Sequence, residues 1–345
     1  MNSPALSVVV IGRNEGARLE GCLQSIAAMR GVSGEKQIIY VDSASTDNSV
    51  DIATALGAEI LVLGVGNLTA ARARNAGWRR ARAPFVLFLD GDTILHPDFP
   101  RLALAALAGD ERIAIAWGHR REIHPEKSLY NRVLDLDWIY EPGDTEFCGG
   151  DMLMRACALK HVDGFDSTLI AGEEPEMCRR LRHAGYRILH IDSPMTGHDL
   201  NISRFGQYWK RALRAGHAYA EISSRYRASS DPMWLSNSRG NFVRGGFWIA
   251  SLIACIASLS MSRLSVLLGL LPLTLWMSLL LALSCRSGWK ARWKAPSKYA
   301  LLALYGIHSH LQHIPILIGQ LECTWSRIAG RQRRLIEYKD SAGLE

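Results

Sequence analysis

The stretch 85-FVLFLDGD-92 joins a run of five apolar residues to two aspartates that flank a single glycine. A continuous apolar run of this length predicts a strand at 85–89 that is buried on both faces of a sheet. Asp90 and Asp92 would follow directly at the end of that strand. An isolated Asp-x-Asp is more often a surface turn, but two carboxylates at a strand terminus suit a hard divalent cation that also bridges phosphates. The position after the apolar run therefore favours a Mg²⁺ or Mn²⁺ site.

Apolar runs alternate with helical segments on both sides of this stretch. The predicted strands are 7–11 (SVVVI), 37–41 (QIIYV), 59–63 (EILVL), 113–123, 147–155 and 187–191. The predicted helices are 16–28, 47–56, 68–81, 174–184 and 204–227. Apolar strands separated by helices indicate an α/β fold, with a Rossmann-like, mixed but mostly parallel sheet and helices on both faces.

Ligands of such sheets bind at the carboxyl ends of the strands, so polar residues after strands are candidate site residues. Asn14 and Glu15 follow the first predicted strand, and Asp42 follows the second. The Asp42 carboxylate can accept a hydrogen bond from a base or a ribose. Glu173, Glu174 and Glu176 open a predicted helix, where one acidic residue would suffice to complement the helix dipole. Crowded carboxylates raise one another's pKa, which favours a general base here.

The C-terminal third contains two apolar stretches, 247–259 and 264–283, separated by a short turn that includes Arg263. With flanking small residues each approaches the length needed to cross a bilayer, and the second lacks the polar stripe that a buried hairpin in a soluble protein would have. We predict a two-helix transmembrane hairpin. Basic residues are concentrated outside the hairpin, so the positive-inside rule places both of its ends, and the body of the chain, in the cytoplasm.

The segment 299–325 is apolar but interrupted by polar residues, which predicts an interfacial helix. His308, His310 and His313 lie in it, but the first two point about 200° apart on a helix, which disfavours a metal site. The predicted domains are thus a catalytic domain at 1–240, the hairpin at 241–285 and a basic tail at 286–345. Oligomerisation through the C-terminal helices is compatible with this division.

The net charge of +7 is uneven, because the last 60 residues contain ten Lys/Arg and four Asp/Glu. This basic excess borders an apolar block, so we expect it to attract anionic membrane lipids and expect no nucleic-acid partner. The seven cysteines form no CxxC pair, which indicates reduced thiols.

Several separated motifs, in order, make residues 7 to about 227 resemble the family 2 glycosyltransferases of the GT-A fold. They are SVVVIGRNEGARLEGCLQSI, YVDSASTDNSVDIA, ARNAGWRRARAPFVLFLDGDTIL, GGDMLMR with VDGFD, and GEEPEMCRRLRHAGYRI. The resemblance implies a nucleotide-sugar donor and an inverting transfer. It also implies the following roles: Asn14 and Glu15 next to the nucleotide, Asp42 at the base, Arg74 near the diphosphate, Asp90 and Asp92 as the Asp-x-Asp motif, His198 completing the metal shell, and Glu174 as catalytic base with Glu173 beside it.

Three departures from the family pattern are visible. The second motif reads Asp-Ser-Ala instead of Asp-Gly-Ser, and the residue at the position of the base is Glu174, where Asp is commoner. The sequence at 207–211 matches the Gln-x-x-Arg-Trp of processive synthases only loosely. Polymerisation is therefore not expected, although Arg211 or Arg214 can still serve as a diphosphate ligand.

The GEEPEM run, the His198–Asp199 pair and the apolar tail are similar to those of bacterial enzymes that build exopolysaccharide on lipid carriers. This implies a UDP-sugar donor, a polyprenyl-diphosphate-linked glycan acceptor and a location at the bacterial inner membrane. Two alternatives remain open, a polyprenyl-phosphate glycosyltransferase and a non-catalytic membrane scaffold. A nucleotidyltransferase is disfavoured, because residues 12–17 do not form a convincing Gly-rich phosphate loop.

Overall fold

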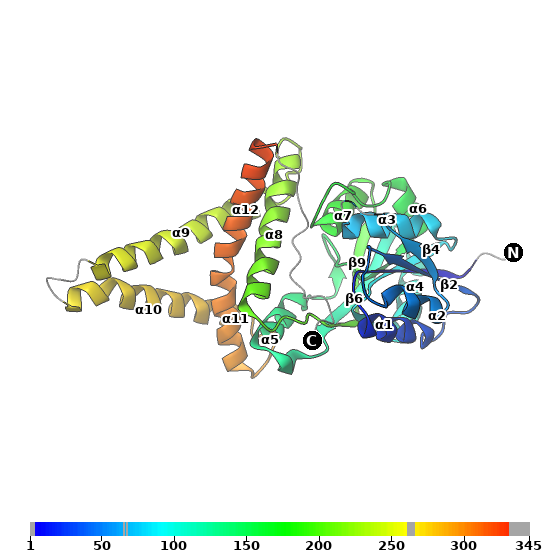
Figure 1. Ribbon diagram of the computed structural model, residues 1–345, viewed down its shortest axis with the longest axis horizontal. Coiled ribbons are helices and arrows are strands. Elements are labelled where there is room, and N and C mark those ends of the chain that lie inside the picture. The colour runs from blue at the N-terminus through cyan, green and yellow to red at the C-terminus, as the bar shows by residue number, and fades with distance from the viewer. Residues whose placement is uncertain (1–3, 65, 67, 261–265, 331–345) are drawn as a thin grey trace. The chain divides into compact units, whose positions relative to one another are not determined.

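The computed structural model describes residues 4–64, 66, 68–260 and 266–330 (Figure 1). The chain folds into two compact units. The described part of the first unit comprises residues 4–124 and Trp138–Asn201, and that of the second comprises Pro125–Asp137 and the described residues from 202 to 330. The long helix after residue 204 thus belongs to the second unit, whereas the sequence-based division placed it in the catalytic domain.

The described strands of the first unit form one nine-stranded sheet in the order β3-β2-β1-β4-β8-β6-β9-β5, with β7 paired to β9. Its parallel half contains β1 (Leu6–Gly12), β2 (Lys36–Asp42), β3 (Glu59–Val62) and β4 (Phe85–Asp90). The other strands are β5 (Thr93–Leu95), β6 (Ile113–Glu122), β7 (Gly143–Asp144), β8 (Met152–Arg155) and β9 (Arg187–His198). The expected mixed, largely parallel sheet is confirmed.

Helices cover both faces of this sheet, with α3 and α7 on the side opposite α1 and α4 (Figure 1). The helices are α1 (Ala17–Ala27), α2 (Ser49–Ala55), α3 (Ala70–Arg80), α4 (Phe99–Gly109), α6 (Ala156–His161) and α7 (Glu173–His183). The central strands are apolar along their length, and Val8, Val9 and Val10 of β1 are fully buried. The α3 helix packs closely on β1, because a Cβ at Gly77 would meet the Val9 side chain. This two-sided burial explains why β1 and β4 read as continuous apolar runs.

Two differences from the predicted elements matter for function. The last strand, predicted at 187–191, extends as β9 to His198, and the predicted strand at 147–155 is reduced to β8. Residues 192–198 lack an apolar run, so the extension depends on pairing with β5 and β6 rather than on local pattern. All seven cysteines are free, as the sequence predicted.

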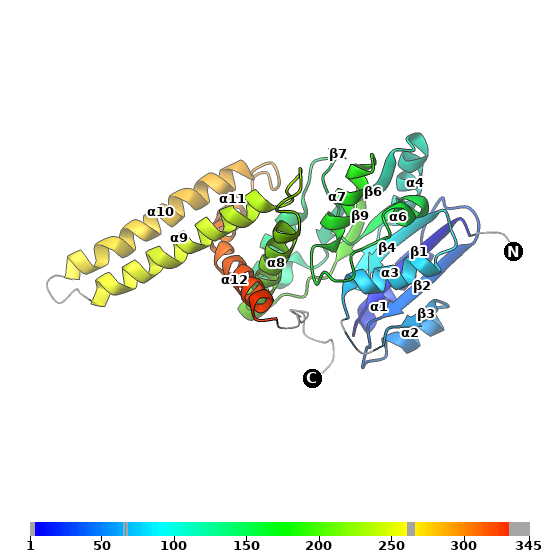
Figure 2. The same cartoon turned by 90° about the horizontal axis from the view of Figure 1, so that it is seen from above.

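The described part of the second unit consists of helices. Its elements are α5 (Leu129–Asp135), α8 (Phe205–Arg225), α9 (Leu235–Ser260), α10 (Val266–Lys290), α11 (Tyr299–Leu311) and α12 (His313–Ile328), with a short 3-10 turn at Pro125–Lys127. A second 3-10 turn, Leu136–Trp138, lies at the boundary between the two units. The α8 and α12 helices lie side by side in both views (Figures 1 and 2). Glycines permit this approach, since a Cβ at Gly216 would meet the carbonyl of Ile316 and a Cβ at Gly319 would meet the carbonyl of Leu213.

Among the described residues, three helical stretches are long and apolar enough to cross a membrane, judged by length and composition alone: Leu235–Ser258, Leu270–Lys290 and Tyr299–Ile328. The first two correspond to the predicted hairpin, and they expose large apolar side chains such as Ile253, Leu275 and Leu281. The third was predicted as an interfacial helix, but α11 and α12 together meet the same criteria as the hairpin helices. These helices indicate membrane association. Arg263 and the end of the basic tail at 331–345 lie outside the described residues.

Candidate active site

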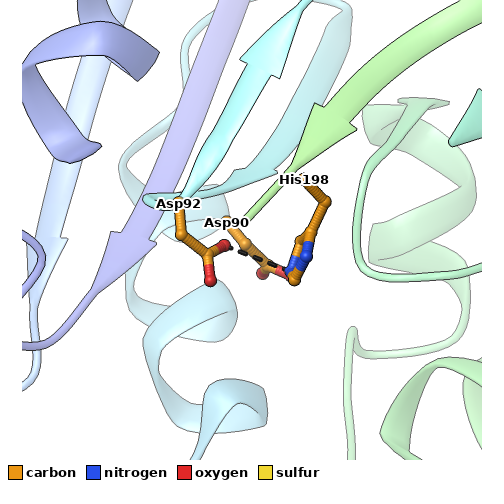
Figure 3. A group of neighbouring side chains, drawn as sticks. All are labelled: Asp90, Asp92 and His198. Atoms are coloured by element: carbon orange, nitrogen blue, oxygen red, sulfur yellow. Dashed lines mark ion pairs between the residues drawn. The ribbon is translucent and has the colours of Figure 1, made fainter. Parts of the chain in front are cut away.

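The turn after β4 meets the end of β9 through strand pairing. β5 follows the Asp90-Gly91-Asp92 turn and pairs antiparallel with β9, with Thr93 opposite His198. The Asp199 amide donates to the Asp92 carbonyl at 3.1 Å, and His198 Nε2 lies 3.3 Å from Asp92 Oδ1. Figure 3 shows the His198 ring beside both aspartates. The pairing therefore joins residues more than a hundred positions apart into one polar cluster.

Asp90, Asp92 and His198 form a group that could hold a metal ion, since each offers one ligand atom and these atoms lie within 4.8 Å of one another (Figure 3). Asp92 and His198 are buried, and Asp90 is partly exposed. The two carboxylates suit Mg²⁺ or Mn²⁺, and the imidazole adds a nitrogen donor. The Trp138 ring packs edge-on against His198, with ring centroids 4.9 Å apart, and holds the imidazole in place. The donor set therefore fits a divalent cation.

Arg74, on α3, joins this group to the carboxylates of α7. Its guanidinium contacts Asp90 Oδ1 at 2.9 Å, Glu173 Oε1 at 3.0 Å and Glu174 Oε1 at 2.9 Å. Burial lowers the pKa of Arg74, but the carboxylates of Glu174 and Asp90 outweigh that effect and raise it, so the side chain is a permanent cation. Arg74 is 2% exposed. Its observed partners are carboxylates of the site, and the contact with a diphosphate that the resemblance implies stays a prediction.

Glu174 has the electrostatic setting of a general base. Burial, and then repulsion from Glu173, raise the pKa of Glu174 to about 7, while the Arg74 cation opposes the rise. The helix that carries both glutamates begins after Gly172, which adopts a left-handed conformation. A carboxyl group with a pKa near neutrality can accept a proton and release it again at physiological pH. The crowding of acidic residues predicted from the sequence thus has the expected effect on Glu174.

A second charged cluster lies on the other side of Asp90 and escaped the sequence analysis. Arg120 Nη2 lies 3.6 Å from Asp90 Oδ2, and Arg120 Nε lies 3.7 Å from the fully buried Asp151. The Arg120 guanidinium also stacks over Trp138, 4.7 Å from the ring centre. Asp151 accepts the Asp90 amide at 3.0 Å and the Thr196 hydroxyl at 2.7 Å, which ties β4, β8 and β9 together. The Gly-Gly-Asp of the GGDMLMR motif was the one sequence signal for this cluster.

The predicted nucleotide-binding residues of β1 and β2 organise adjoining loops. Asn14 has a positive φ of 56°, and its side-chain oxygen accepts the Thr46 amide at 2.8 Å. The buried Asp42 accepts the Tyr40 hydroxyl at 3.0 Å and the Ser45 amide at 2.8 Å. Glu15 forms an ion pair with Arg18 at 2.9 Å. The β1 and β2 loops are thus brought together, and direct contact of these residues with a nucleotide stays a prediction.

The remaining predicted residues, Arg211 and Arg214, lie on α8 in the second unit. Their role at a diphosphate also stays a prediction. Within the first unit, six of the predicted residues form one continuous set centred on Asp90 and Arg74: Arg74, Asp90, Asp92, Glu173, Glu174 and His198.

Comparison with known proteins agrees with this geometry. Residues 7–165 match the family described as Glycosyl transferase family 2. Validoxylamine A glucosyltransferase from Streptomyces hygroscopicus subsp. jinggangensis is 26% identical over 231 residues, which cover 56% of this chain and 53% of that protein. This chain therefore spans about half the length of that relative. The N-terminal part of the chain is therefore similar to glycosyltransferase family 2.

Solved structures show the same fold. The mannosyltransferase PcManGT from Pyrobaculum calidifontis, in complex with GDP-Man and Mn²⁺, has a TM-score of 0.64 at 16% identity, over 95% of this chain and 89% of that one. Residues 1–349 of S. aureus TarS, in complex with UDP-GlcNAc, give a TM-score of 0.50 at 16% identity, over 94% and 92% of the two chains. The fold of the first unit is therefore GT-A.

Proposed function

We propose that this protein is a metal-dependent, inverting glycosyltransferase that transfers a sugar from a nucleotide-sugar, of the UDP class, to a hydroxyl of a lipid-linked saccharide. The observation that carries the proposal is the bridge of Arg74 between Asp90 and Glu174. Arg74 links the candidate metal ligand Asp90 to Glu174, a carboxylate with a pKa near 7, inside one largely buried polar cluster. A single small substrate can touch both ends of such a cluster.

In the proposed reaction Glu174 accepts the proton of the acceptor hydroxyl as its oxygen attacks the anomeric carbon. A new C–O bond forms on one face of the sugar while the bond to the diphosphate breaks on the other. The nucleoside diphosphate leaves with the bonding electrons, and the anomeric configuration inverts. Asp90, Asp92 and His198 would hold a Mg²⁺ or Mn²⁺, which supplies positive charge to the departing diphosphate. Arg74 keeps Glu174 oriented and offsets the repulsion from Glu173.

A nucleotide-sugar donor is supported by structural neighbours and by the site, and the UDP class by one of those neighbours, TarS. PcManGT was solved with GDP-Man and Mn²⁺, and TarS with UDP-GlcNAc, both on this fold. A hydroxyl acceptor is supported by Glu174 itself, because a phosphate acceptor, as in a polyprenyl-phosphate glycosyltransferase, is already ionised and needs no base. The three apolar helices support an acceptor carried by a membrane lipid. With the positive-inside rule, they also support a location at the inner membrane with the catalytic unit in the cytoplasm.

The test uses the full chain in lipid nanodiscs with a panel of nucleotide-sugars, lipid-linked saccharide acceptors and Mn²⁺ or Mg²⁺. Glu174→Gln should lower transfer by about 100-fold or more, the usual contribution of a general base, and leave nucleotide binding by calorimetry nearly unchanged. Glu20→Gln is the matched control, because Glu20 is an exposed glutamate on α1. Near-normal turnover of Glu174→Gln would remove the proposed base. Absence of transfer with every donor would favour the non-catalytic scaffold.

A further inference from the structure

A pocket of about 400 Å³ lies within the second unit, where the C-terminal part of α8, the N-terminal part of α9 and the C-terminal part of α12 meet. Its volume falls in the range of ordinary small-ligand sites. The catalytic carboxylates and the metal-ligand group take no part in its lining. The pocket is therefore a separate structural feature that the proposed transfer reaction does not explain.

The charged residues that line the pocket are all basic. Three arginines contribute to it, Arg227 after α8, Arg239 on α9 and Arg327 on α12, while none of its described lining residues is acidic. Arg327 donates a hydrogen bond to the Ser224 hydroxyl, which orients its guanidinium along the pocket wall. Three guanidinium groups from three different elements favour an anionic ligand, and phosphate matches their fork geometry best.

One of the lining residues carries a buried acceptor. Gln320 is 5% exposed, and its Nε2 donates to the Ser238 carbonyl at 3.1 Å and also to the Ser238 hydroxyl. These two bonds define the orientation of the amide and leave Gln320 Oε1 without a hydrogen-bond partner among the described residues. A buried acceptor without a donor is unfavourable, and a hydroxyl group on the ligand would satisfy it. The ligand should therefore carry hydroxyl groups as well as phosphate.

The position of the pocket along α9 indicates that the ligand comes from the membrane. Arg239 lies in the second turn of a candidate membrane span, Leu235–Ser258, and the predicted apolar run begins at residue 247. Eight residues of helix separate the two, a rise of about 12 Å, which places Arg239 outside the hydrocarbon core, at the outer edge of a headgroup layer that is about 5–8 Å deep on each side. Leu235, Phe242 and Leu321 supply apolar surface to the same pocket. A ligand with a polar head and an acyl part fits this combination.

We propose that this pocket binds the headgroup of an anionic phospholipid that carries free hydroxyl groups, as phosphatidylglycerol does. The arginines contact the phosphodiester, Gln320 Oε1 accepts a headgroup hydroxyl, and the apolar side chains contact the first carbons of the acyl chains. The bound lipid would hold the junction of α8, α9 and α12 at the membrane surface.

The experiment measures lipid retained on the full chain by native mass spectrometry after release from nanodiscs. The nanodiscs contain phosphatidylcholine with phosphatidylglycerol, or with phosphatidylmethanol, which has the same charge and no headgroup hydroxyl. The wild-type chain should retain phosphatidylglycerol in preference to both other lipids. Arg239→Gln and Arg327→Gln should each weaken retention of both anionic lipids by roughly tenfold, the usual effect of losing a charge-assisted hydrogen bond.

Two controls separate a specific site from general attraction to charge. Arg244→Gln removes an exposed arginine of the same helix that does not line the pocket, so it should leave retention unchanged. Gln320→Leu should abolish the preference for phosphatidylglycerol over phosphatidylmethanol while keeping binding of both, with a thermal unfolding measurement to establish that the variant is folded. Glu174→Gln should retain lipid normally, so failure of the transfer proposal leaves this test unaffected. Equal loss in Arg244→Gln and Arg239→Gln, no preference between the two anionic lipids, or equally tight binding of soluble glycerol phosphate would overturn the proposal.

Discussion

The Arg74 guanidinium lies 2.9 Å from the Glu174 carboxylate, and this ion pair connects α3 to α7. The same guanidinium reaches Asp90 and Glu173, so one buried cation contacts three carboxylates. The arrangement depends on these partners, because a buried charge without a partner is strongly unfavourable. Stability and chemistry of the site therefore depend on the same contacts.

Replacing Arg74 should lower both the stability of the protein and the rate of the reaction. Arg74→Met leaves three crowded carboxylates and should lower the free energy of unfolding by about 3–5 kcal/mol, measured by denaturant titration. Arg74→Lys keeps the charge but cannot contact three carboxylates with one planar group, so we expect a folded protein with reduced kcat and a smaller change in KM. Arg79→Gln, on the exposed side of the same helix, should stay within about 0.5 kcal/mol of the wild-type protein. Wild-type kcat in Arg74→Lys would contradict the orienting role.

The Asp92–His198 pair should govern metal affinity. Asp92→Asn and His198→Ala should weaken Mn²⁺ binding, measured by calorimetry or electron paramagnetic resonance, by about 100-fold or more. The reason is that loss of even an outer-sphere partner costs about 10- to 100-fold. Asp192→Asn changes an exposed aspartate of β9 that pairs with His119 and serves as the control. Equal Mn²⁺ affinity in Asp92→Asn and Asp192→Asn would exclude the proposed ligand group.

The transfer rate should depend on pH through Glu174. The base acts in its ionised form, and its pKa is raised to about 7 by burial and by Glu173, so kcat/KM should increase tenfold per pH unit below 7 and level off above it. Glu173→Gln removes the repulsive neighbour and should move the midpoint to lower pH. A folded-state pKa above the unfolded value also means that the contribution of Glu174 to stability is present below about pH 4.5 and is lost as pH rises through 7. A flat profile between pH 5.5 and 8 would contradict the assignment of the base.

Helix packing in the second unit should be sensitive to one glycine and insensitive to another on the same helix. A Cβ at Gly216 would meet the Ile316 carbonyl, so Gly216→Ala should destabilise the α8–α12 contact by about 1–3 kcal/mol, seen as a lower Tm in detergent. A Cβ at Gly206 would meet nothing within 4 Å, so Gly206→Ala should be neutral or slightly stabilising. A similar Tm for both variants would contradict the close approach of the two helices.

The order of strands and helices in the first half of the chain was predictable because each element carries its own signal. The runs at 7–11, 37–41 and 85–89 are apolar apart from Ser7 and Gln37, and each became a strand of the parallel half of the sheet. Residues 192–198 carry no such signal, and they form a strand only because β5 and β6 pair with them. The role of Arg120 and Asp151 was missed for the same reason. Arg120 pairs with Asp151 and contacts Asp90 and Trp138, and no pattern within one element predicts these contacts.

Local sequence patterns were enough to predict the α/β class, the apolar helices that follow it and the acidic motifs at the strand and helix ends. These depend on hydrophobic periodicity and on neighbours within one element. Two contacts become visible only in the folded chain: Arg74 pairs with glutamates 99 and 100 positions away, and His198 lies against Asp92. Those contacts arise from strand pairing and helix packing between distant segments, whose geometry depends on how the whole sheet assembles.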